Sequence, residues 1–312
     1  MPNKKTDTTG KKPRVRSQPK HRSFKLTNKK YRQPESIPVP WKIFKDTLRL
    51  ILQNKILFGG IAIINAIISF AFVQGFGSSF ELSSVKTDIE NLFNGQVSQI
   101  SIGAALFGYL VGTAGVSASE SSGVYQLFFT LFTSLAIIWT TRQLLAQEKP
   151  RIRDGYYRGL YPLIPFLLVI ILIGIQLVPL IAGNLIFTTV INNGLAVTIL
   201  EKVLWLLLFI VLGMLSLYML TSSLFGLYIV TLPDMTPLKA LRSARELVLH
   251  RRVAIAIRLL ALPILLAIIT VAIFMPLVFV APLAAQYLFL LATSFALVIV
   301  HVYMYLLYRS LL

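Results

Sequence analysis

Residues able to carry acid–base chemistry are scarce in the apolar stretches of this chain. His301 is the one acid–base residue well inside such a stretch, and three tyrosines follow it closely. Ionisable side chains inside a membrane are costly and usually functional. His301 therefore predicts either a proton or substrate contact, or a hydrogen-bonded histidine in an interfacial aromatic belt. Glu246 and His250 are the nearest thing to an acid–base pair, but they lie among Lys and Arg, which favours a solvated, salt-linked face.

Known catalytic patterns are absent from the sequence. It contains no Walker loop, no G-x-S-x-G, no H-E-x-x-H, no D-x-D-x-D and no pair of carboxylates beside an apolar stretch. It has no cysteine and 3 widely separated histidines, so thiol nucleophiles, disulfides, iron–sulfur clusters and a histidine-rich metal site are not expected. We predict a protein without enzymatic activity of its own and without a cofactor.

Neutral polar side chains recur at helical spacing within two apolar stretches. Gln126 and Thr130 begin one stripe, and Gln286 and Thr293 belong to another. On a helix each stripe faces one direction. Such stripes either pack against other helices and hydrogen-bond there, or line a polar cavity. Together with His301, these four residues form the predicted polar face inside the membrane.

Six apolar stretches are long enough to position these residues within a bilayer. Hydrophobic residues make up 56% of the 312 residues and charged residues only 13%, against roughly 25% in a soluble domain. A helix needs about 20 apolar residues to cross the hydrocarbon core. The expected spans are about 56–74, 124–141, 163–183, 203–230, 253–279 and 283–308. The predicted fold class is all-α, a polytopic membrane helix bundle with six transmembrane helices.

The basic residues are segregated along the chain. Lys and Arg number 30 and Asp and Glu 12, for a net charge of +18. When residues 1–55, 142–162, 231–258 and the C-terminal end are placed on one side, 28 of the 30 basic residues lie there. Cytoplasmic loops carry the excess of Lys and Arg. We therefore predict a plasma (inner) membrane protein with both termini cytoplasmic.

Two apolar or neutral segments do not fit as spans. Residues 100–117 are rich in Gly, Ala and Ser, and counting them as a span would place the later basic loops outside. We expect a re-entrant or interfacial helix there, within a long external loop over 75–123. Residues 184–199 are expected to form a second external element. Prolines, including those at 179 and 276, predict bends in the third and fifth spans.

The first part of the chain reads as a disordered basic tail. Residues 1–32 contain 12 Lys or Arg and one acid, and such a segment cannot bury enough apolar surface to fold. We divide the chain into a cytoplasmic tail over 1–40 and a transmembrane domain over 41–312. The tail is either a topology signal alone or an arm for anionic lipid headgroups or RNA. Nucleic acid is not otherwise expected as a partner, apart from contact of this tail with the ribosome.

Three basic amphipathic segments precede spans, over residues 41–55, 151–161 and 236–252. Each of these amphipathic segments is followed by a span, an outer turn and a returning span, which suggests a weak repeat of three units. A helix with Lys and Arg on its polar face lies in the headgroup plane. Arg258, near the start of the fifth span, is expected to reach the inner headgroups. The residues predicted to contact anionic lipid or a protein partner are Lys239, Arg242, Arg245, Arg252, Arg151 and Arg153.

The segment 232–252 carries a resemblance to known families. Pro237, Ala240, Leu241 and Leu247 fit a P-x-x-A-L-x-x-S-x-x-L pattern, with Ser243 one position early. The segment thus resembles the glycerophosphodiester phosphodiesterase membrane-domain family and related bacterial six-span proteins. The resemblance implies a membrane module only, because nothing here matches the phosphodiesterase domain. The segment also resembles, more faintly, the cytoplasmic loop of ABC permeases, but it lacks the glycine that those loops carry.

Three functions remain open from the sequence. The first is a non-enzymatic multi-pass protein that organises lipid, the envelope or another membrane complex. The second is a transporter or ABC-type permease subunit whose cytoplasmic amphipathic helices couple to a partner. The third is an insertase-like or ribosome-associated factor that uses the basic tail.

Overall fold

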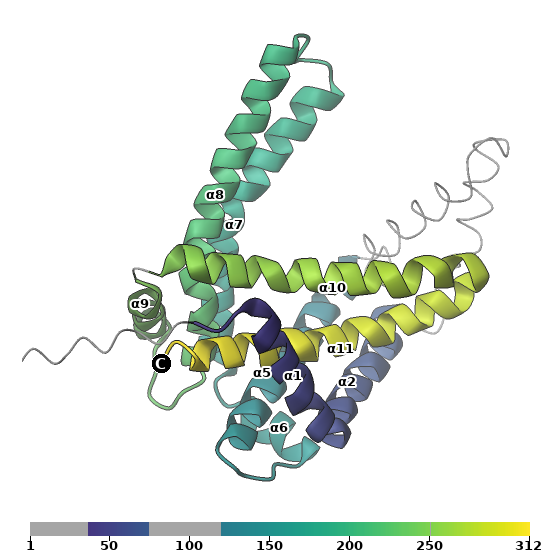
Figure 1. Cartoon of the computed structure of the whole chain (residues 1–312), viewed down its shortest axis with the longest axis vertical. Helices are drawn as coiled ribbons and strands as arrows, with labels where there is room; N and C mark the ends of the chain where they lie inside the picture. Colours follow the sequence, from purple (N-terminus) through teal and green to yellow (C-terminus); the bar gives the residue numbers. More distant parts are fainter. Residues whose placement is uncertain (1–36, 75–119, 250) are drawn as a thin grey trace, which may run out of the picture. The chain divides into compact units, whose positions relative to one another are not determined.

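The computed structural model describes residues 37–74, 120–249 and 251–312, and this part of the chain is helical, without strands (Figure 1). Most of the predicted tail, the predicted element over 100–117 and His250 lie outside the described residues. The helices are α1 Pro40–Gln53, α2 Lys55–Ser69, the π-helical turn η1 Phe70–Gln74, α5 Glu120–Leu145, α6 Ile152–Gly159, α7 Leu163–Asn192, α8 Ile199–Ile229, α9 Pro237–Val248, α10 Arg252–Val280 and α11 Pro282–Arg309.

Six of the described helices are long and apolar enough to cross a membrane, namely α2, α5, α7, α8, α10 and α11. Each has an interior almost free of charge. A backbone can cross a bilayer only when its polar groups are paired internally, as they are in a helix. The prediction of an all-α membrane helix bundle is confirmed, and the protein is a multi-pass membrane protein.

The external element predicted over residues 184–199 is wrong. Residues 184–192 continue α7, and α8 begins at Ile199, so only the short turn 193–198 joins two antiparallel helices that pack side by side (Figure 1). Polar residues near the end of α7 suggested an earlier stop. In the helix, however, the Thr188 hydroxyl donates to the Asn184 carbonyl at 2.8 Å, so this polar group is satisfied locally. Gly194 supplies the positive φ of 63° that the turn requires.

Prolines lie inside α7 and α10 without ending either helix. Pro179 is within α7, and Pro263 and Pro276 are within α10. Proline removes one N–H and pushes on the preceding turn, so nearby backbone groups need other partners. Beside Pro179, the Leu180 N–H donates to the Ser216 hydroxyl of α8 at 3.1 Å. At Pro179, the neighbouring helix thus supplies a hydrogen-bond partner for the backbone next to the proline.

The three predicted amphipathic segments form α1, α6 and α9. In α9 the Thr236 hydroxyl caps the helix by accepting from the Lys239 N–H at 3.4 Å, and a proline occupies the first turn. Its buried face consists of Ala240, Ala244 and Val248, which pack on α7 and α8. These small side chains let α9 lie close to α8.

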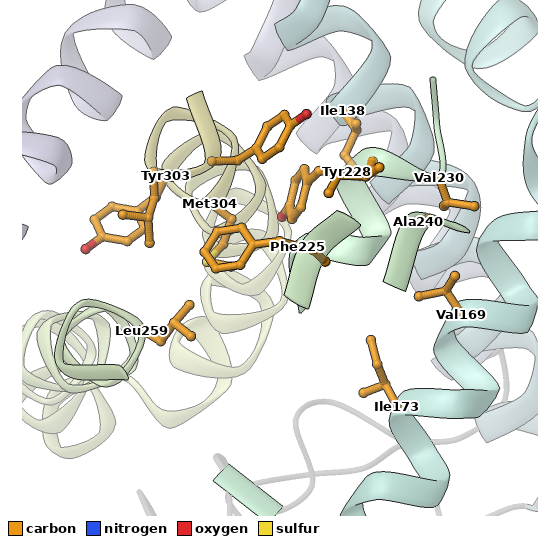
Figure 2. Packing of buried hydrophobic residues seen from close by; sticks show 14 of the residues in the cluster. Ile138, Val169, Ile173, Phe225, Tyr228, Val230, Ala240, Leu259, Tyr303 and Met304 are labelled. Carbon is orange, nitrogen blue, oxygen red and sulfur yellow. The ribbon is translucent and has the colours of Figure 1, made fainter. Parts of the chain in front are cut away.

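A hydrophobic core gathers the ends of several helices. It contains Ile138 of α5, Val169 of α7, Phe225 of α8 and Leu259 of α10, all buried. Figure 2 shows these side chains converging with Tyr303 and others of α11 and with Ala240 of α9. In contrast, few apolar side chains in the long middle parts of α7, α8 and α10 are buried, as expected of surfaces that contact lipid tails.

Arg258 is hydrogen-bonded to backbone carbonyl groups of the protein. Its guanidinium donates to the carbonyls of Ile37 and Pro38, at 2.6 and 2.8 Å, and to that of Ala254 at 2.6 Å. The residues just before α1 have no helical donors for their carbonyls, and buried carbonyls need partners. Arg258 meets that need and fastens the start of α1 to α10.

Helix α6 lies against α5 at unusually short range. Gly155 and Gly159 are buried on its inner face, and a Cβ added at Gly159 would stand 3.0 Å from the Leu135 carbonyl oxygen. The neighbouring Tyr156 donates its hydroxyl to the Ile61 carbonyl of α2 at 3.5 Å. Burial raises the pKa of Tyr156, so this hydroxyl stays protonated at neutral pH.

We expect Gly159→Ala to destabilise the protein by about 1–3 kcal/mol, because the new methyl group would meet backbone atoms of α5 that cannot move aside. Gly174→Ala in α7 is the matched control, since nothing lies within 4 Å of its Cβ position. It should be neutral or stabilising by up to about 1 kcal/mol. Thermal unfolding of the purified variants in detergent measures both, and equal effects would contradict the close contact.

Candidate functional site

A cavity of about 310 Å³ lies where α7, α8, α9 and α10 meet. Gln176 of α7, Tyr218 and Ser222 of α8, Arg245 of α9 and Arg252 of α10 contribute polar or charged groups to its wall. It brings together two of the basic residues predicted to contact anionic lipid. Its mixture of two cations with neutral polar groups makes it the strongest candidate site among the described residues.

Close packing between α8 and α9 positions one of these arginines. Gly226 of α8 faces Leu241 of α9, and a Cβ at Gly226 would stand 3.0 Å from a Leu241 methyl carbon. Leu241 also lines the cavity, and Arg245 lies one helical turn further along α9. The contact of Leu241 with Gly226 thus places Arg245 near α8.

A ring contact fixes the second arginine. The Arg252 guanidinium carbon lies 4.1 Å from the centroid of the Tyr218 ring, a cation–π distance. Neither Arg245 nor Arg252 forms an ion pair or a hydrogen bond within the described residues. Arg252 is also the first residue of α10, whose first turn contains no acid. The positive end of the helix dipole therefore adds to the arginine charge.

The cavity wall also contains hydrogen-bond acceptors. The side-chain oxygen of Gln176 is buried and has no partner within the described residues. A buried acceptor without a donor costs free energy. The Ser222 hydroxyl donates to the Met219 carbonyl at 3.0 Å, which leaves its oxygen lone pairs available. The site can thus receive an anion on one side and a hydrogen-bond donor on the other.

Helix length indicates the depth of this cavity. The 31 residues of α8 extend about 46 Å, whereas the hydrocarbon core is about 30 Å thick, or about 20 residues. If the turn 193–198 lies at one boundary, about 20 residues of α8 bring the chain to Tyr218 at the other. Tyrosines favour that boundary. With the turn at one boundary, the cavity would lie at the level of the opposite headgroups.

The other predicted basic residues lie outside this cavity. Lys239 and Arg242 are exposed on α9. Arg151 lines a separate cavity of about 570 Å³ with Lys55 and Lys149, and Arg153 is exposed on α6. The other polar residues of the cavity, Gln176, Tyr218, Ser222 and Ser223, were not among the predicted site residues. Only the isolated polarity of Gln176 in an apolar stretch could have indicated it.

His301 lies in a hydrogen-bonded chain across three helices. Its Nδ1 is 3.0 Å from the Tyr228 hydroxyl of α8, and its Nε2 is 2.8 Å from the Ser134 hydroxyl of α5. The Ser134 hydroxyl itself donates to the Thr130 carbonyl at 2.6 Å. Because the Ser134 proton is used in this way, Nε2 donates to Ser134, and in a neutral imidazole Nδ1 accepts from the Tyr228 hydroxyl. Each of the side chains in this hydrogen-bonded series, those of His301, Tyr228 and Ser134, thus has a partner.

The predicted polar stripes meet other helices rather than one common cavity. Asn65 of α2 donates to the Ser294 hydroxyl of α11 at 3.0 Å and accepts from Thr133 of α5 at 2.9 Å. Thr293 lines a cavity of about 220 Å³ between α10 and α11, which Gln126, Thr130 and Gln286 do not line. The Gln286 side-chain oxygen is buried and has no partner within the described residues.

Comparisons with protein-family models, curated proteins and solved structures found no match to this chain. The resemblance to the glycerophosphodiester phosphodiesterase membrane-domain family therefore stays a prediction. The function must be argued from the geometry of the site.

We expect Tyr228→Phe and His301→Leu to destabilise the protein non-additively, because both remove the same hydrogen bond. The coupling energy should be about 0.6–1.7 kcal/mol, the range for hydrogen bonds between membrane helices. Unfolding free energies of the two single variants and the double variant in mixed micelles measure it. Thr270→Val combined with Tyr228→Phe is the control, since Thr270 bonds only to Leu266 of its own helix. A coupling near zero for the first pair would contradict the chain.

Proposed function

We propose that this is a non-enzymatic protein of the plasma (inner) membrane, with both termini cytoplasmic, that holds anionic lipid headgroups against its basic helices and so organises the surrounding lipid. The observation that carries this proposal is the set of exposed cations on α6 and α9, which lack ion-pair partners among the described residues. A membrane complex that gathers around such lipid is the natural protein partner.

Binding to anionic headgroups lowers the free energy of these exposed cations relative to contact with water alone. Each Lys or Arg near an anionic membrane surface contributes about 1 kcal/mol to binding. Arg153 on α6 and Lys239 and Arg242 on α9 are exposed, and α9 is an amphipathic helix whose apolar face is buried on α7 and α8. The polar faces of these helices are thereby left for headgroups. A topology with these cations inside agrees with the distribution of basic residues along the chain.

The transporter alternative has less support. It relied on polar side chains lining one shared cavity, but Asn65, Thr133 and Ser294 bond to one another between helices. His301 is likewise occupied by partners on both ring nitrogens. These groups use their hydrogen-bonding capacity inside the protein, which favours a packing role.

Reporter fusions test the proposed topology. We expect a cytoplasmic reporter to be active when fused after Lys149, after Asp234 or at the C-terminus, because these positions flank the basic helices. A periplasmic reporter should be active after Gly194, in the turn between α7 and α8. A C-terminus or Lys149 position found outside would contradict the topology.

Lipid selectivity in proteoliposomes tests the proposed function. Spin-labelled phosphatidylglycerol should associate with the protein more strongly than spin-labelled phosphatidylcholine, and high salt should weaken this preference. Replacing Lys239 and Arg242 by Gln should lower it by up to about fivefold for each charge removed. Lys202→Gln, near the turn 193–198, is the control and should change nothing. Chromatography should find the lipids chemically unaltered. A preference insensitive to salt and to these variants, or conversion of the lipid, would overturn the proposal.

A further inference from the structure

We propose that the cavity among α7, α8, α9 and α10 binds a single phosphodiester headgroup that has its own hydrogen-bond donor, as in phosphatidylglycerol. The phosphate would lie between Arg245 and Arg252, and a headgroup hydroxyl would donate to the Gln176 side-chain oxygen. This inference rests on the proposed function and gives it one defined binding site. General attraction of headgroups to exposed cations does not require this cavity.

The two arginines supply the phosphate subsite. They come from different helices, line the same cavity and have no ion pair among the described residues. Two like charges at one cavity repel each other, and the positive end of α10 increases the repulsion at Arg252. A bound phosphate removes this penalty and accepts the planar, multiple N–H donors of guanidinium. Because the Tyr218 ring holds the Arg252 guanidinium at 4.1 Å, this donor set is already oriented.

Gln176 supplies the selectivity for a donor beside the phosphate. Gln176 lines the cavity, and its side-chain oxygen is buried without a partner in the described part of the chain. A site with a buried unpaired acceptor rejects a ligand that cannot donate to it. A phosphodiester with a free hydroxyl satisfies the acceptor, whereas one that ends in an alkyl group does not.

The position of the cavity favours a lipid over a soluble phosphodiester. Met219 and Leu241 line it beside the polar groups, and exposed Met214 and Leu215 continue the apolar surface along α8. A headgroup held at Tyr218 would extend its acyl chains along this surface. The volume of about 310 Å³ is several times the ~30 Å³ that one water molecule occupies in the liquid.

Native mass spectrometry of the full chain in detergent tests the site. The probes are phosphatidylglycerol and phosphatidylethanol, which have the same charge but differ in the headgroup hydroxyls. We expect the first phosphatidylglycerol to bind the wild-type protein roughly fivefold to tenfold more tightly than phosphatidylethanol, the ratio for satisfying one buried acceptor.

Variants separate the two subsites. Arg252→Gln should weaken the first binding event for both lipids, by about tenfold for a charge-assisted contact. Lys202→Gln is the control: it removes one positive charge from an exposed position near the turn 193–198, outside the cavity, and should leave that event unchanged. Gln176→Leu should abolish the difference between the two lipids and leave the phosphate contact in place. Thermal unfolding verifies that each variant remains folded.

Each result has a defined meaning. Equal affinity of the wild-type protein for both lipids, or equal losses in Arg252→Gln and Lys202→Gln, would overturn the site even if salt-sensitive selectivity for anionic lipid persists. Loss of that selectivity altogether would overturn the proposed function as well. Competition by the deacylated phosphoglycerol headgroup distinguishes the source of the ligand. Weak competition supports a membrane lipid, and competition as strong as that of the intact lipid would overturn it in favour of a soluble phosphodiester.

Discussion

The scarcity of water in the bilayer is the constraint on which the rest of this structure depends. A polar group inside the hydrocarbon core must find its partner within the protein. The long helices satisfy their own backbones, and several of their polar side chains meet in pairs and chains between helices. The clearest case is His301, whose two ring nitrogens are bonded to residues of two other helices. Asn65 likewise joins α2, α5 and α11 through its amide. These contacts fix which helix faces pack together, since apolar surfaces alone do not distinguish a helix from lipid.

The same constraint explains the different surroundings of the arginines at the ends of the apolar helices. Arg258 is a cation near the start of an apolar helix, and it is stabilised by three carbonyl groups, two of them from the segment that leads into α1. Arg245 and Arg252 have no such partners within the described residues, although Arg252 rests on the Tyr218 ring. The difference separates a structural arginine from arginines that remain available. Charge segregation sets the side of the membrane on which they lie, and local pairing decides which of them can bind anything.

The sequence was sufficient for the large features of the fold. Apolar length predicted the six long helices, and the periodicity of basic and apolar residues predicted α1, α6 and α9. Its error over residues 184–199 arose because polarity near a helix end was taken as a boundary. Residues 184–192 belong to α7 because a hydroxyl such as that of Thr188 can bond back to its own helix. The role of Arg258 depends on the carbonyls of Ile37 and Pro38, which are distant in the chain. No local pattern contains that information.

The candidate site was only half predictable for a related reason. Arg245 and Arg252 stood out because cations follow a simple rule of membrane topology. Gln176 and Tyr218 obey no such rule, and they become significant only when α7, α8 and α10 come together. Once they do, the two halves of the site depend on each other. Unpaired cations need an anion, and a buried acceptor beside them needs a donor. A bare anion would leave the acceptor unsatisfied, and a neutral donor would leave the cations unpaired. A headgroup that carries both groups in one molecule meets the two requirements at once, which is why selectivity among lipids of equal charge should reside in Gln176.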